Sequence, residues 1–184
     1  MKKFTIFETT IQKQKKMKNF LPFEKVLLKT SLSEENAIKR LSQYVEIPMS
    51  VFAKSFGKSA QTPYEGRISG NKFKIARAIR SRNPGLPKIR GIVYRENAST
   101  LIKLSLKLHG FIMVFFFGWI IGSTIGVISV SVNMAKEGVF NPIVFVPLGI
   151  LLAGYLIFMI GFWIESKIAK RDLMEYFEAE QVIG

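Results

Sequence analysis

The pattern of hydrophobic and polar residues changes abruptly near position 109. From Thr100 to Leu108 apolar and polar residues alternate, which is the period of a half-buried β-strand. From Phe111 onwards the chain is apolar all round for about twenty residues, which is typical of a membrane-spanning helix. The sequence therefore predicts a sheet joined almost directly to a transmembrane helix, with only His109 and Gly110 between them.

Two segments are long and apolar enough to cross a membrane. The ranges Phe111–Val132 and Ile143–Ile164 contain no charged residue, and each exceeds the roughly 20 helical residues that a bilayer requires. The segment between them has one lysine and one glutamate, whereas basic residues precede the first span and follow the second. Because Lys and Arg gather on the cytoplasmic side, we expect both termini in the cytoplasm.

The region before the first span predicts an α+β fold. The segment 20–33 is a candidate strand, and the capping box Ser31-Leu32-Ser33-Glu34 predicts a helix that continues to about Val45. Residues 49–56 fit helical spacing, but the run is short. Four alternating segments separated by turn residues then predict strands at Tyr64–Ser69, Lys72–Arg80, Lys88–Arg95 and Thr100–Leu108. We expect an antiparallel β-meander with one covering helix, followed by two transmembrane helices.

This pattern divides the chain into four parts. Residues 1–18 form a basic tail and residues 19–108 a cytosolic α+β domain. Residues 109–165 form a transmembrane helical hairpin, and residues 166–184 form a cytosolic helix or tail.

Charge adds a strong asymmetry to this picture. The net charge is +14, and the first 108 residues hold 23 Lys and Arg against 7 Asp and Glu. If the predicted strands keep their register, one face of the sheet is apolar and the other is basic. The basic face would carry Tyr94 and the cations Lys72, Lys74, Arg80, Lys88, Arg90, Lys103 and Lys107.

The basic face has two interpretations. It is either a solvated outer surface or a face that contacts anionic lipid headgroups or an anionic partner. The membrane tether favours lipid, because each Lys or Arg near an anionic surface contributes about 1 kcal/mol of attraction.

Arg77 is an exception to the alternation, because it falls on the apolar side of its strand. A charge in that position must be paired or reach the edge of the sheet. Two arrangements fit: Arg77 pairs with Glu46 or Glu65, or it joins Arg82 and the neighbouring Asn83 in an anion-binding cluster.

Small residues recur along both predicted spans. Gly118, Gly122 and Gly126 are four residues apart, as are Gly149 and Ala153 in the second span. This spacing lets another helix approach closely, either within the hairpin or in a second copy of the chain.

Several kinds of chemistry are disfavoured by the sequence. There is no cysteine and a single histidine, His109, so we expect no metal centre and no cofactor. No phosphate-binding glycine loop or nucleophile motif is present, and we expect no enzymatic activity. Nucleic acid is an unlikely partner, because the basic face offers mainly Tyr94 for base stacking.

Three motifs resemble a family of small bacterial membrane proteins without an assigned activity. They are the F-x-I-x-R strand at Phe73–Arg77, the R-N-x-x-L-P turn at Arg82–Pro87 and the L-H-x-F junction at Leu108–Phe111. The similarity covers residues 20 to about 171 and implies a cytosolic α+β domain with a two-helix hairpin in the bacterial inner membrane. It implies no mechanism.

Two classes of function follow. The chain is a membrane-anchored binding or sensor module for an anionic ligand, lipid headgroups or a protein partner, or it is an assembly subunit of a larger membrane complex. A third possibility is an effector whose homo-oligomerised spans perturb the bilayer.

Overall fold

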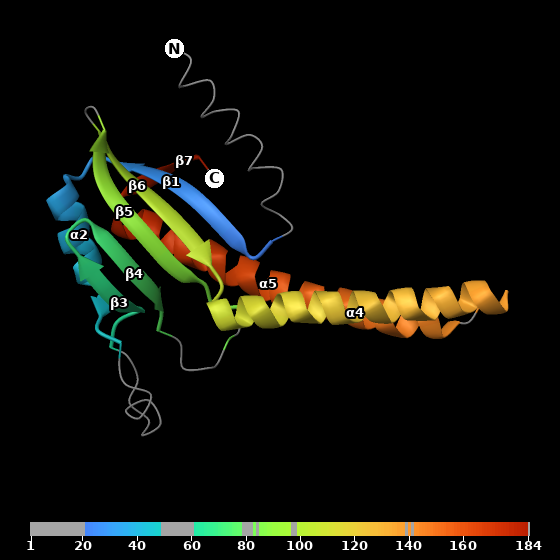
Figure 1. The fold of residues 1–184 in the computed structure, drawn as a ribbon. Coiled ribbons are helices and arrows are strands. Elements are labelled where there is room, and N and C mark those ends of the chain that lie inside the picture. The colour runs from blue at the N-terminus through green and yellow to red at the C-terminus, as the bar shows by residue number, and fades with distance from the viewer. Residues whose placement is uncertain are drawn as a thin grey trace, which may run out of the picture.

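The computed structural model describes residues 21–48, 61–78, 83, 85–96, 99–138, 140 and 142–183. Within these residues, seven strands form one sheet in the order β2-β3-β4-β5-β6-β1-β7. A hairpin of two long helices projects from one end of the sheet (Figure 1). The chain therefore has the α+β fold that the sequence predicts, while residues 49–56 lie outside the described ranges.

The described elements are short strands and helices of very different length. The strands are β1 (Phe23–Thr30), β2 (Val45–Glu46), β3 (Tyr64–Ser69), β4 (Lys72–Arg77), β5 (Lys88–Glu96), β6 (Ser99–Lys107) and β7 (Ala179–Ile183). The helices are α2 (Glu34–Ser42), α4 (Gly110–Glu137) and α5 (Phe145–Tyr176), with a 3₁₀ turn η1 (Pro142–Val144) before α5.

The sheet is larger and less regular than a meander. Strands β3 to β6 form the predicted antiparallel meander, but β1 adds to β6, β7 adds to β1, and β2 pairs with β3 in parallel. Because β1 precedes the hairpin and β7 follows it, their pairing holds the two segments on the same side of the hairpin.

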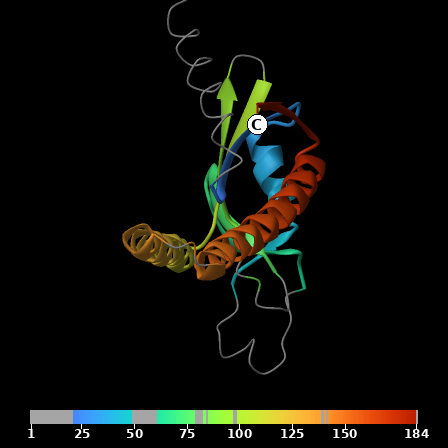
Figure 2. The ribbon, with the colours of Figure 1, turned by 90° about the vertical axis from the view of Figure 1, so that its right-hand side faces the viewer.

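Two helices cover the apolar face of the sheet, where the sequence predicts one. Helix α2 and the last part of α5 lie on the same side of the sheet (Figure 2). Phe162, Ala169 and Leu173 of α5 are buried in the same core as Leu28 of β1 and Leu41 of α2. Their spacing of seven and four residues puts them on one helical face, so the C-terminal part of α5 belongs to the core.

Helix α2 begins two residues later than the capping box predicts, because its N-cap is Ser33 and not Ser31. The Oγ of Ser33 accepts a hydrogen bond from the backbone N–H of Asn36 at 3.2 Å. The helix ends at Ser42, before the predicted end at about Val45, and Val45 belongs to β2. Ala37 and Leu41 are its buried residues, as expected for the face that meets the sheet.

Helices α4 and α5 are long and apolar enough to cross a membrane. In the most apolar 18-residue stretch of each, only 6% is buried. Helix α5 has 32 residues, which corresponds to about 48 Å at helical rise. Since the hydrocarbon of a bilayer is about 30 Å thick, α5 is long enough to continue beyond it. One unbroken helix therefore links the apolar hairpin to the core of the sheet.

Candidate functional site

The outer face of the sheet, which points away from α2 and α5, carries a dense set of exposed cations. We call it the basic face; its cations are Lys25, Lys29, Arg67, Lys72, Lys74, Lys88, Arg90, Lys103 and Lys107. Tyr94 lies on the same face and is partly buried. The structure thus brings together the described members of the predicted basic set, while Arg80 and Arg82 lie outside the described residues.

Three members of the basic face are not in the predicted set. Lys25 and Lys29 lie on β1, which the sequence does not place beside β6, and Arg67 lies on β3. The sequence shows that these three cations alternate with apolar residues. It does not show the order of the strands, which brings them onto the same face as the predicted set.

The register of the sheet places like charges directly opposite one another. Lys74 of β4 lies between Arg67 and Arg90, and Lys88 of β5 lies opposite Lys107. Directly opposed side chains have Cβ atoms roughly 5 Å apart, and like charges at that separation destabilise a sheet. An anion bound on this face would relieve the repulsion.

Acidic side chains reach the basic face only at its margins, as far as the described residues show. Glu65 lies on β3, Glu96 ends β5, and Glu180 of β7 is opposite Lys29. In the described ladders, no carboxylate lies directly opposite a cation of β4, β5 or β6 on this face.

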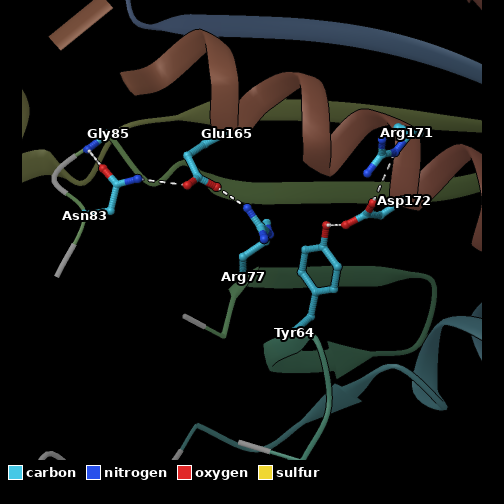
Figure 3. Close-up of polar contacts among 7 residues, drawn as sticks. All are labelled: Tyr64, Arg77, Asn83, Gly85, Glu165, Arg171 and Asp172. Carbon is cyan, nitrogen blue, oxygen red and sulfur yellow. Dashed lines mark hydrogen bonds and ion pairs between the residues drawn. The ribbon is translucent and has the colours of Figure 1, made fainter. Parts of the chain in front are cut away.

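The covered face of the sheet, which packs against α2 and α5, carries a charge that is paired. Arg77, at the end of β4, forms an ion pair with Glu165 of α5, a partner that neither of the two arrangements suggested by the sequence includes (Figure 3). Both side chains are largely shielded, with 24% and 10% of their surfaces exposed. The partner is 88 residues away in the sequence, so local spacing does not reveal it.

A tight turn completes this junction between sheet and helix. The Nδ2 of Asn83 donates to Glu165 Oε1 at 2.8 Å, while its Oδ1 accepts from the backbone N–H of Gly85 at 2.9 Å (Figure 3). A Cβ at Gly85 would lie 2.6 Å from the backbone carbonyl carbon of Gly161 in α5. The turn therefore packs backbone to backbone against the helix.

Further polar contacts hold α5 along the domain. Lys170 Nζ lies 2.7 Å from Glu24 Oε1, and Thr30 Oγ1 donates to the carbonyl of Phe177 at 2.6 Å. The hydroxyl of Tyr64 donates to Asp172 Oδ2 at 3.0 Å (Figure 3). Burial, with the nearby carboxylate, raises the pKa of Tyr64 well above its ordinary value, so this hydroxyl keeps its proton.

The predicted small-residue positions of the hairpin are only partly used in packing. Gly118 and Gly122 have no described atom within 4 Å of an added Cβ, whereas Gly126 meets Pro147 at 3.4 Å. The three glycines line an open groove of about 490 Å³ beside Trp119. Gly149 also faces open space, and Ala153 lines a second groove.

The tight helix contact in the hairpin involves another glycine. A Cβ at Gly154 would lie 2.2 Å from the indole nitrogen of Trp119. Within one chain, the indole ring thus packs against Gly154, and the contact does not use Gly118 or Gly122.

Comparisons with family models, with curated proteins and with solved structures each find no match to this chain. Among the described residues, no group of three or more His, Asp and Glu side chains is placed to hold a metal ion.

Proposed function

We propose that this protein is a membrane-anchored binding module whose basic face holds an anionic partner at the cytoplasmic surface of the membrane. The observation that carries the proposal is the row of opposed cations on β3, β4 and β5 with no acidic residue between them. A folded domain gains nothing from this arrangement by itself, because like charges directly opposite one another are destabilising.

The hairpin supplies the anchor. Large apolar side chains such as Ile121 and Ile157 are 59% and 68% exposed, and water would solvate such a surface poorly. Lipid covers it without cost, which supports insertion of both helices. The pairing of β1 with β7 is compatible with two crossings that leave both ends of the domain on one side, and the positive-inside bias supports the cytoplasm as that side.

The test compares two sets of charge reversals that change the net charge equally. In neutral nanodiscs, the full chain should bind dextran sulfate, and affinity should fall as salt rises. Reversing Lys72, Lys74, Lys88 and Arg90 to Glu should abolish this binding. The control reverses Lys39, Lys136, Lys167 and Arg171, which lie elsewhere, and should retain most of it. Equal losses in the two variants would show that only net charge matters and would refute the proposal.

An assembly subunit is the second candidate, and the open glycine groove favours it. A Cβ added at Gly122 would have no described atom within 4 Å, so Gly122→Leu should leave the stability of a single chain unchanged. If a partner helix occupies the groove, the same substitution should dissociate the complex, measured as a smaller particle by light scattering in mild detergent. An unchanged particle would exclude the groove as an assembly contact.

A further inference from the structure

We infer that the partner of the basic face is the acidic surface of another protein, standing beside the domain, and not the bilayer below it. The inference rests on the proposed function. Its first support is orientation: seen along the hairpin, the sheet is nearly edge-on, with α2 and α5 on one side and the basic face directed to the other (Figure 2). A hairpin that crosses the bilayer therefore turns this face sideways.

The position of the cations along the strands supports the same occupant. Lys107 and Lys88 form the row nearest the hairpin, because β6 leads directly into α4. The row of Lys74 and Arg90 follows, and then the row of Lys103. Same-face residues are about 6.7 Å apart along a strand, so the third row lies up to about 13 Å beyond the first. At physiological salt, attraction to headgroups is screened over about 8 Å.

The chemistry of the face suits a protein surface. Ile92, which is 40% exposed, lies between Lys72 and Lys103, and Leu101 is partly exposed on the same face. Protein interfaces combine such apolar contacts with charge complementarity. Single-stranded nucleic acid needs exposed aromatic rings for stacking, and on the described part of this face only Tyr94 is aromatic besides Phe23 at its edge.

The residues outside the described ranges do not form an acidic segment. Glu8 is the only acidic residue among them, and it stands beside several lysines and arginines. Their composition therefore favours another molecule as the occupant. Three rows across five strands give an area on the order of 400 Å², about half of one side of a standard interface, so we expect a salt-sensitive and transient contact.

The experiment uses the full chain in nanodiscs and three defined probes. Polyglutamate represents an acidic protein, a thymidine oligonucleotide of equal charge represents nucleic acid, and phosphatidylglycerol in the disc represents an anionic bilayer. Polyglutamate should bind in neutral discs, and K74E/R90E should weaken it about tenfold or more while leaving thermal unfolding unchanged. The same affinity, within about threefold, should be measured in discs that contain phosphatidylglycerol.

Each failure has a distinct meaning. If phosphatidylglycerol abolishes polyglutamate binding, or if K74E/R90E has no effect while K88E/K107E does, the bilayer occupies the face and the inference is wrong, although the proposed function stands. Markedly tighter binding of the oligonucleotide overturns the inference in favour of nucleic acid. If no probe binds in neutral discs, the proposed function fails as well.

Discussion

The two faces of the sheet handle charge in opposite ways. On the covered face, Arg77 pairs with Glu165, which also accepts a hydrogen bond from Asn83, and the neighbours of Arg77 along β4 are the buried Phe73 and Ile75. On the basic face of the same strand, Lys74 lies between two further cations. The same backbone thus carries a neutralised charge on one side and an accumulated one on the other.

This difference separates folding from binding. A charge under a helix must be paired, because burial without a partner costs several kcal/mol. A charge in water carries no such requirement, so a dense cluster can persist there at small cost. Substitutions on the covered face should therefore change stability, and substitutions on the basic face should change binding.

The largest expected effect comes from removing one member of the buried pair. Glu165→Ala leaves Arg77 shielded without its carboxylate and should lower the free energy of unfolding by about 3 kcal/mol. Replacing both by methionine should restore much of that loss, because no unpaired charge remains. The measurement is denaturant unfolding of the full chain in detergent, with the exposed Glu175→Ala on the same helix as the control. Similar small losses in both alanine variants would contradict the claimed role of the pair.

A second test concerns the backbone contact between the turn and α5. Gly85→Ala should cost about 1–3 kcal/mol, because the new methyl would lie 2.6 Å from the backbone of Gly161. Gly161→Ala is the matched control, since its nearest atom, Gly85 Cα, is 3.5 Å away, an ordinary contact distance. Thermal unfolding of both variants decides the matter, and equal midpoints would show that the turn does not press against the helix.

The hydrogen bond from Tyr64 to Asp172 should contribute less. Tyr64→Phe should cost about 1 kcal/mol near neutral pH. Because the pKa of Tyr64 is raised in the folded state, the unfolded chain loses this proton first, and stability should fall as pH rises above about 10. The phenylalanine variant should show a shallower alkaline loss in pH-dependent unfolding. Parallel curves for the two proteins would rule out this contribution.

The smallest effect on stability is expected on the basic face. Lys74→Ala removes a charge that lies between two others, so stability should stay within about 0.5 kcal/mol or rise slightly. Denaturant unfolding at low and high salt measures this. A large loss would mean that Lys74 has a structural partner.

The sequence predicts those parts of the fold that local patterns encode. Alternation locates β3 to β6, and the uncharged segments locate the two long helices, but strand pairing between distant segments has no local signal. The placement of β7 beside β1 and the continuation of α5 into the core are examples. The spacing of Phe162, Ala169 and Leu173 does indicate a buried helical face that begins near the end of the second predicted span and continues among charged residues.

The candidate site divides in the same way. The basic set on β4 to β6 follows from alternation alone, because a strand has two faces. The partner of Arg77 does not, because Glu165 meets it only when α5 folds back over the sheet. Only the structure reveals tertiary contacts of this kind, and only the structure shows that the space beside Gly122 is open.

Lysine footprinting asks whether Lys72, Lys74 and Lys103 of the basic face are accessible in the isolated chain and covered by a partner at the membrane. The acetylation of Lys72, Lys74 and Lys103 would be compared between native membranes and purified chain in neutral nanodiscs. These three lysines should be labelled more slowly in native membranes, and high salt should restore the rate. Lys39 and Lys167, exposed on the helical side, should label equally in both. If each of the five lysines is labelled at the same rate in both preparations, no partner covers the basic face at the membrane.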